Sequence, residues 1–153
     1  MVERDEGVEE LLAASRGLLG VVARSLSVAL ESVTVPQFRL VVLAAAHGPV
    51  RSGDLAARLD VSISTLSRNV DRLVAKGYVD RRTNEDNRRE SLVTATASGH
   101  ALIAGVTERR RAELEALLGA MPASERRKVV LGAHALRTAF DDPSVDQLAA
   151  FGG

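Results

Sequence analysis

Residues 52–77, SGDLAARLDVSISTLSRNVDRLVAKG, contain two short helical patterns separated by a turn. Asp60 stands at the turn, and aspartate tolerates a left-handed backbone better than most residues. Serines suit the N-caps of the two helices, at Ser52 and Ser62. The second helix places one apolar stripe at helical spacing, at Ile63, Leu66, Val70, Leu73 and Val74. The stretch therefore predicts a helix-turn-helix whose second helix is buried along this stripe.

A hairpin pattern follows directly after Gly77. Two short β-type runs, YVDRRT at 78–83 and SLVTA at 91–95, flank the polar segment NEDNRRE at 84–90. These runs predict two antiparallel strands joined by a long turn. A helix-turn-helix followed by a hairpin is a winged helix, in which the hairpin is the wing.

Long helical patterns lie on both sides of this core. Residues 8–31 carry a wide apolar stripe, and residues 98–118 and 124–140 are also helical in pattern. These stripes are larger than a small winged core can cover, whereas two chains related by symmetry can cover each other. We therefore expect a homodimer held together by these helices.

The predicted fold class is mainly α with a small β-hairpin: a winged helix-turn-helix core plus N- and C-terminal dimerisation helices. Thr34 and Gln37 have capping-box spacing and mark the start of the first core helix. The expected division is an N-terminal dimerisation helix in 1–35, the winged core in 36–97, C-terminal dimerisation helices in 98–140 and a loose tail in 141–153.

The composition excludes several classes of protein. The chain has 153 residues, enough for one domain or one domain with an extension. It has no cysteine, which excludes disulfide scaffolds, thiolate zinc sites and cysteine redox switches. No unbroken run of 18 apolar residues occurs, and the N-terminal MVERDEGVEE lacks the order of a signal peptide. These observations predict no membrane span and a cytoplasmic location.

The net charge is zero, from 20 basic and 20 acidic residues, but the charges are unevenly distributed. Residues 1–35 have three bases and six acids, a net charge of −3, whereas residues 36–99 have ten bases and seven acids, a net charge of +3. Residues 100–153 have seven of each. The winged core is therefore the part of the chain best suited to an anionic partner.

The polar face of the second helix has the composition of a DNA-reading surface. Backbone N–H groups and hydroxyls near a helix start can bind phosphate, and arginine and asparagine can bind guanine and adenine edges. An ordinary solvated helix has a similar face, but the preceding helix and the basic hairpin favour DNA. The candidate DNA-binding residues on this helix are Ser62, Ser64, Thr65, Arg68, Asn69 and Arg72.

Arginines on the hairpin extend the candidate DNA interface. Arg81 lies on the first strand, and Arg88 and Arg89 lie at the tip. A carboxylate can hold a tip arginine in shape for the minor groove, whose potential attracts it, and we assign this supporting role to Asp86. Alternatively, the arginines and the nearby acids form surface ion pairs of little energetic weight.

The segment LAARLDVSISTLSRNVDRLVAKGYVDR, residues 55–81, and the arginine-rich hairpin leading to Thr96 and Gly99 resemble the winged-helix core of the multiple antibiotic resistance regulator (MarR) family. The likeness covers residues 36–99 closely, and the flanking helices match in order and length. It implies a homodimer with intertwined first and last helices that binds a palindromic operator in double-stranded DNA. It also implies repression that a small aromatic or phenolic ligand relieves.

Position in the family pattern assigns roles to two hairpin arginines. Arg81 falls on the arginine that ends the first wing strand, and Arg89 falls on the wing arginine. Two other positions depart from the pattern. Asn87 stands where the family has a wing aspartate, so Asp86 is expected to replace it. Ala95 stands where the family has leucine, which thins the packing at the base of the hairpin.

The resemblance places small ligands between the dimerisation helices and the winged core. The first helix and residues 38–47 supply the lining there. Polar side chains in these segments can meet an acidic ligand, although each also suits a solvated surface or a helix terminus. They are Arg16, Arg24, Arg39 and His47. The three histidines are far apart in sequence, and we predict neither a metal site nor a cofactor.

We therefore predict a dimeric, sequence-specific DNA-binding transcriptional regulator that acts as a repressor. We do not expect an enzyme, because no nucleophile elbow, metal motif or phosphate-binding loop occurs. The alternative is a winged-helix module that binds another protein without specific DNA binding. The polar, arginine-bearing face of residues 62–72 argues against it, since protein-binding faces usually present apolar anchors.

Overall fold

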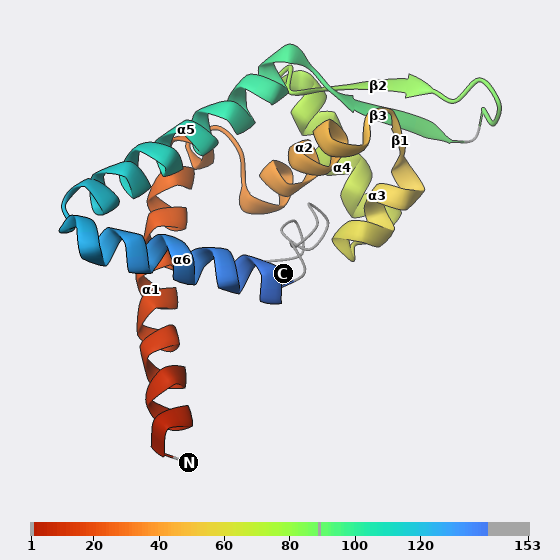
Figure 1. The fold of residues 1–153 in the computed structure, drawn as a ribbon. Helices are drawn as coiled ribbons and strands as arrows, with labels where there is room; N and C mark the ends of the chain where they lie inside the picture. Colours follow the sequence, from red (N-terminus) through yellow and green to blue (C-terminus); the bar gives the residue numbers. More distant parts are fainter. Residues whose placement is uncertain (1, 89, 141–153) are drawn as a thin grey trace.

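The computed structural model describes residues 2–88 and 90–140, and Figure 1 shows the arrangement of its elements. In chain order these are α1 (Val2–Leu30), α2 (Val35–His47), β1 (Val50–Arg51), α3 (Ser52–Leu59), α4 (Ile63–Ala75), β2 (Val79–Thr83), β3 (Ser91–Ala95), α5 (Ala97–Gly119) and α6 (Ala123–Ala139). The protein is mainly helical with one small antiparallel sheet, so the predicted fold class is confirmed. The tail expected in 141–153 lies outside the described residues.

Local backbone rules place the helices of the winged core. Asp60 follows α3 with a φ of 52° and a ψ of 48°, the left-handed conformation expected at the turn. The Ser62 hydroxyl accepts a hydrogen bond from the Thr65 N–H at 3.2 Å and caps α4, as predicted. Thr34 and Gln37 form the predicted capping box at the start of α2. These contacts fix where each of the helices begins or ends.

The sheet contains a strand that the sequence pattern did not predict. Its order is β1-β3-β2, and β1 pairs with β3 through Val50 opposite Val93. Arg51 occupies the N-cap of α3 but makes no capping hydrogen bond with its side chain, so the prediction of Ser52 as the N-cap is wrong. Ser52 is the first helical residue, and its Oγ lies 2.6 Å from Oγ of Ser91 on β3. This side chain therefore ties α3 to the sheet.

The core lies among α2, α3, α4 and the sheet. Its largest fully buried side chains include Leu40, Leu43, Leu55, Leu66, Leu73, Val41, Val70, Val79 and Val93. The predicted stripe of α4 is only partly buried, because Ile63 and Val74 are 58% and 41% exposed. These residues lie at the two ends of α4, beyond its buried middle. The prediction that they belong to the core is wrong.

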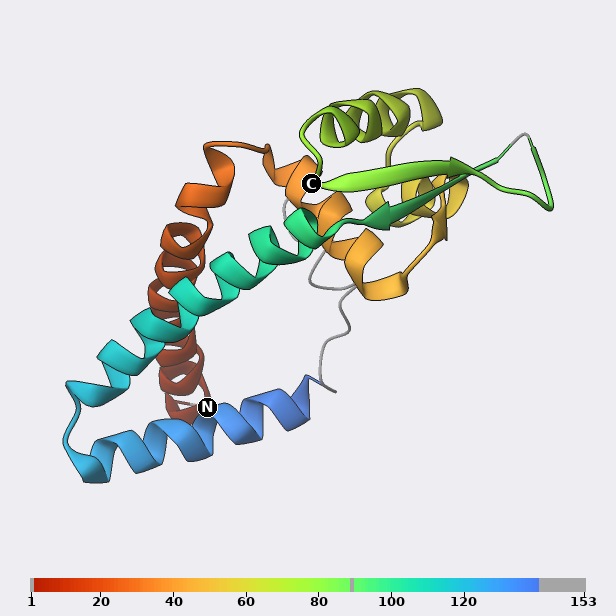
Figure 2. The same cartoon turned by 90° about the horizontal axis from the view of Figure 1, so that it is seen from above.

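The long helices extend away from the winged core (Figures 1 and 2). α1 packs against α5, and the buried residues of this pair include Val21, Ser25, Ala29 and Val106. α6 contains no buried residue. Large apolar side chains are exposed along the three helices, at Val8, Leu11, Leu12, Leu18, Leu19, Leu117, Val129, Val130, Leu131 and Leu136.

α1 also meets the length and hydropathy criteria for a membrane span. Within Glu6–Leu30 the mean hydropathy reaches 1.4 over 18 residues, of which 11% are buried. The prediction of no span relied on the absence of an unbroken apolar run, and that criterion did not reveal this helix. α1 nevertheless packs on protein, since Arg24 forms an ion pair with Glu113 of α5. One such helix is weak evidence for a membrane, because the buried core helix of a soluble protein and a signal sequence near the N-terminus pass the same test.

Candidate nucleic-acid interface

The polar face of α4 is open to solvent. Ser62, Ser64, Arg68 and Arg72 are exposed, and Thr65 and Asn69 are half-buried. At the start of the helix, Ser62 Oγ lies 3.0 Å from both Ser64 Oγ and Thr65 Oγ1. Arg68 Nε donates a hydrogen bond to the Ser64 carbonyl oxygen at 3.3 Å. The face therefore presents a group of hydroxyls at its first turn and cationic side chains further along the helix.

Arg81 on β2 is bonded to α4. Its Nη1 lies 2.8 Å from Asp71 Oδ1, and its Nη2 donates a hydrogen bond to the Ser67 hydroxyl at 3.0 Å. The Arg81 side chain is 30% exposed and the Asp71 side chain is 61% exposed. Sequence reasoning missed both partners, although their four-residue spacing places them on one side of a helix. The DNA contact assigned to Arg81 stays a prediction.

Asn84 and Glu90 close the base of the hairpin turn. The buried Asn84 donates from its backbone N–H to the Glu90 carbonyl at 3.0 Å and from Nδ2 to the Glu90 carboxylate at 3.3 Å. Its Oδ1 accepts the backbone N–H of Asp86 at 3.2 Å. The Glu90 carboxylate also lies 3.6 Å from Arg51 Nε on β1. Sequence reasoning missed this network, because hydrophobic periodicity gives no information about a polar turn.

The hairpin tip carries the two arginines assigned to DNA. Arg88 is exposed. Arg89 lies outside the described residues, so the support expected from Asp86 stays a prediction. Asn87 accepts the Glu90 N–H through its backbone carbonyl at 2.9 Å and so takes part in the turn.

A pocket of about 230 Å³ separates the hairpin from the starts of α3 and α4. It is lined by Ser52, Gly53, Ile63, Leu66, Ser67, Arg81, Glu90 and Ser91. Of these residues, only Arg81 was predicted to belong to the DNA site. Ile63 was missed because an apolar residue at helical spacing is normally assigned to the core.

The side chains proposed for a ligand site do not line the described pockets. Arg16 is exposed on α1, Arg39 is half-buried on α2, and the Nε2 of His47 lies 3.5 Å from Arg58 Nη1. A second pocket, on α5, is lined by Thr107, Arg110, Arg111, Leu114, Glu115 and Leu118. The ligand role of Arg16, Arg39 and His47 stays a prediction. Within the described ranges, no group of three or more His, Asp or Glu residues could hold a metal ion.

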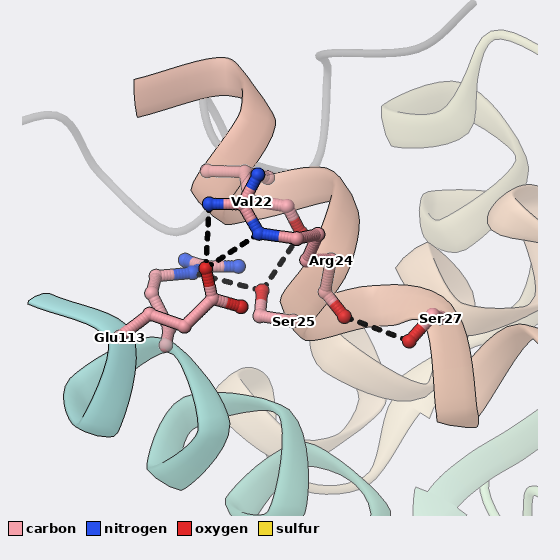
Figure 3. Close-up of polar contacts among 6 residues, drawn as sticks. Val22, Arg24, Ser25, Ser27 and Glu113 are labelled. Atoms are coloured by element: carbon pink, nitrogen blue, oxygen red, sulfur yellow. Dashed lines mark hydrogen bonds and ion pairs between the residues drawn. The ribbon is translucent and has the colours of Figure 1, made fainter. Parts of the chain in front are cut away.

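Arg24, the fourth candidate for the ligand site, is bonded to α5 (Figure 3). Its Nε and Nη2 each lie 2.7 Å from Glu113 Oε2. Beside this pair, the buried Ser25 hydroxyl donates to the Val22 carbonyl at 2.7 Å and accepts from Arg110 Nε at 3.3 Å. These polar contacts tie α1 to α5 at Arg24 and Ser25.

The corner between α1 and α2 is tied to the end of α4. Lys76, directly after α4, donates a hydrogen bond from Nζ to the Ser32 carbonyl. The Tyr78 hydroxyl donates to Ser32 Oγ at 3.2 Å. The long N-terminal helix and the candidate DNA-reading helix are therefore joined through one residue of the corner.

Comparison with known proteins gives a consistent result. Residues 33–91 match the model of the MarR family. The uncharacterised HTH-type transcriptional regulator YfiV of Bacillus subtilis is 26% identical over 110 residues, which are 72% of this chain and 69% of that protein.

Solved structures extend the match to the flanking helices. RV1404 from Mycobacterium tuberculosis is 37% identical, with a TM-score of 0.76 over 88% of this chain and 92% of that chain. FabT of Streptococcus pneumoniae, solved in complex with DNA, is 17% identical and shares the fold, with a TM-score of 0.60 over 90% of this chain and 97% of that chain.

Proposed function

The chain belongs to the MarR family of transcriptional regulators, and from this premise we propose that it is a homodimeric repressor that binds a palindromic DNA operator. Proteins of this family are transcriptional regulators and not enzymes. The observation that carries the proposal is the exposed polar face of α4, with hydroxyls at its first turn and Arg68 and Arg72 further along. In this proposal α4 is the recognition helix and enters the major groove.

Each candidate side chain has a role in the proposed complex. The hydroxyls of Ser62, Ser64 and Thr65 bind phosphate near the start of the recognition helix. Arg68 and Asn69 bind guanine and adenine edges. Positive charge at the phosphate backbone or in the flanking minor groove comes from Arg72, Arg81, Arg88 and Arg89.

A second copy of the chain would cover the apolar faces of the long helices. α6 has no buried residue, and Val129, Val130 and Leu131 on it are 43%, 51% and 62% exposed. Exposed apolar side chains on a helix that buries none of its residues suit an interaction site, and a two-fold axis lets the same faces cover each other. Two recognition helices related by that axis would meet half-sites about 10 base pairs apart, centre to centre.

We also propose that a small aromatic or phenolic ligand relieves repression. The support is the family resemblance and the polar side chains of Arg16, Arg39 and His47 on α1 and α2. Addition of a hydroxybenzoate to the protein–operator complex tests this point. Release of DNA while the helical circular dichroism stays constant supports it, and unchanged binding across a panel of aromatic acids contradicts it. We propose that DNA binding requires no cofactor. We propose a cytoplasmic location, because the proposed partner is DNA.

Selection of bound duplexes from a random DNA library tests the proposal as a whole. We expect one palindromic sequence to be enriched, and we expect this sequence to compete for binding in a gel shift where random DNA does not. Equal competition by random DNA, or no binding at all, would overturn specific regulation through DNA.

The alternative, a winged helix that binds another protein, has little support on α4. The exposed large apolar residues of this helix are Ile63 and Val74, which lie at its opposite ends. They form no continuous apolar patch of the kind that anchors a protein partner. The exposed arginines between them suit DNA better.

A further inference from the structure

Ile63 is an apolar side chain on the surface of the helix proposed to read DNA. It is the first residue of α4 and is 58% exposed. Its two neighbours are Ser62 and Ser64, whose hydroxyl oxygens lie 3.0 Å apart. The buried part of α4 consists of Leu66, Val70 and Leu73, so most of the Ile63 side chain does not contribute to the core.

The place of Ile63 in the helix directs its side chain toward DNA in the proposed complex. Cα–Cβ bonds in a helix tilt toward the N-terminus, so a side chain in the first turn projects past the helix end. The N-terminal residues of a recognition helix are those that contact base edges. Ile63 also lines the pocket beside Arg81 and Glu90, and the hairpin extends from the core at this end of α4 (Figure 2).

The proposed dimer does not account for the exposure of Ile63. The apolar faces assigned to the dimer lie on α1, α5 and α6. In both views the N-terminal part of α1 and all of α6 lie on the opposite side of the winged core from the hairpin (Figures 1 and 2). The partner that would contact Ile63 is therefore the DNA, which in the proposed complex lies at the start of α4.

An apolar side chain has one specific partner on the major-groove edge of DNA, the 5-methyl group of thymine. We propose that Ile63 is a specificity-determining residue that packs against the 5-methyl group of one thymine in each half-site of the operator. This inference rests on the proposed function and states what one residue of the recognition helix reads. Phosphate contacts by the flanking serines would hold the helix end close enough for this packing.

Val74 provides a matched control on the same helix. It is also apolar and is 41% exposed. Eleven residues are close to three helical turns, so Val74 lies on the same side of α4 as Ile63 but about 16 Å further from the N-terminus. A side chain there is too far along the helix to contact the same base.

The experiment removes the methyl group from the DNA and the side chain from the protein. An operator is first selected from a random library with the full wild-type chain. Each thymine is then replaced by uracil, one symmetric pair at a time, which deletes only the 5-methyl group. Affinity for each duplex is measured by fluorescence anisotropy with the wild type and with Ile63→Ala, Ile63→Val and Val74→Ala.

We expect one symmetric pair of uracil replacements to weaken wild-type binding by about fifteenfold. This value corresponds to about fourfold for each methyl group removed from an apolar contact. Ile63→Ala should bind the thymine and uracil duplexes equally, and Ile63→Val should retain part of the difference. Val74→Ala should show the full wild-type difference.

Two results would overturn the inference while specific DNA binding stands. One is wild-type affinity that no uracil replacement changes, and the other is an Ile63→Ala variant that keeps the full difference. A selection that returns no specific sequence would instead overturn the proposed function, and this inference with it. Thermal unfolding of Ile63→Ala should match the wild type, because the side chain is mostly exposed.

Discussion

The guanidinium of Arg81, on the first hairpin strand, lies 2.8 Å from the carboxylate of Asp71 on α4. The same guanidinium donates a second hydrogen bond to the hydroxyl of Ser67, one turn earlier on that helix. Two bonds from one planar group restrict rotation as well as distance. These two bonds therefore hold the hairpin against α4 in the absence of DNA.

The first prediction concerns this contact. Asp71→Asn removes a negative charge from the proposed DNA face, so simple electrostatics predicts tighter binding. We expect weaker DNA binding, because Arg81 loses its charged partner and the hairpin is then no longer held against α4. Anisotropy titrations with operator DNA measure the effect, and Arg81→Ala added to Asp71→Asn should cause less than the sum of the two losses.

Asp80→Asn is the control for charge alone, since Asp80 is an exposed acid on the neighbouring position of β2. It should leave binding unchanged or tighten it. If Asp71→Asn behaves in the same way as Asp80→Asn, the contact with Arg81 does not organise the DNA site.

The second prediction assigns base reading to Arg68. Arg68→Ala should lower affinity for the selected operator by roughly 5- to 150-fold, the equivalent of about 1–3 kcal/mol for a bidentate base contact. Affinity for random duplex should change much less. Arg127→Ala, on the exposed α6, removes the same charge outside the winged core and should change neither value. Equal losses on both duplexes would make Arg68 a phosphate ligand instead.

The third prediction concerns the hairpin tip. Arg89→Ala removes two positive charges from the dimer, so the slope of log affinity against log salt should flatten by roughly two units. Asp86→Ala should weaken binding although it removes a negative charge, because we assign Asp86 the support of the tip arginine. Glu85→Ala alters an adjacent exposed acid and serves as the matched control. Tighter binding by Asp86→Ala, with an unchanged slope for Arg89→Ala, would show that the hairpin does not read DNA.

The fourth prediction tests the dimer. Val130→Asp places a charge on the exposed apolar face of α6, where the partner subunit would bury it, so we expect monomers in sedimentation velocity at micromolar concentration. Val74→Asp makes the same change at an exposed valine of the winged core and should leave the dimer intact. A wild-type chain that sediments as a folded monomer would contradict the proposal directly.

The fifth prediction concerns packing between α5 and the hairpin. A Cβ added at Gly99 would lie 2.3 Å from the Tyr78 carbonyl oxygen and 3.2 Å from Val41 Cγ1. Helix propensity favours alanine, but a backbone oxygen cannot move aside easily, so Gly99→Ala should lower the free energy of unfolding by about 1–3 kcal/mol. Gly53→Ala meets no atom within 4 Å and should raise it by about 0.5–1 kcal/mol. Urea unfolding of both variants measures the difference.

Local rules of sequence predicted most of the fold. The left-handed turn at Asp60, the cap at Ser62 and the capping box at Thr34 depend on one or a few neighbouring residues, and all three are present. Strand β1 was missed because it has only two residues, too few to show alternation. Its existence depends on pairing with β3, which lies some forty residues further along the chain.

The candidate site was predictable in its location and less so in its contacts. Helical periodicity identified the polar face of α4, but it does not show where along the helix the core ends, so Ile63 was assigned to the wrong environment. The bond between Arg81 and Asp71 joins a strand to a helix, and no spacing rule within one element describes it. The contacts of Arg89 with DNA and with Asp86 stay predictions.

Ser32 lies at the junction between the long N-terminal helix and the winged core. Its carbonyl and hydroxyl accept hydrogen bonds from Lys76 and Tyr78, so the chain just after the 29-residue α1 is held next to the C-terminal end of α4. α1 is about 44 Å long, and a tilt of a few degrees about its end near Ser32 moves its far end by several ångströms. In a dimer joined through these helices, a change in the angle between the two copies of α1 would also change the distance between the two copies of α4. A molecule that binds between the two copies of α1 and changes their angle would then change the half-site spacing that the protein fits, without contacting the surface proposed to face DNA.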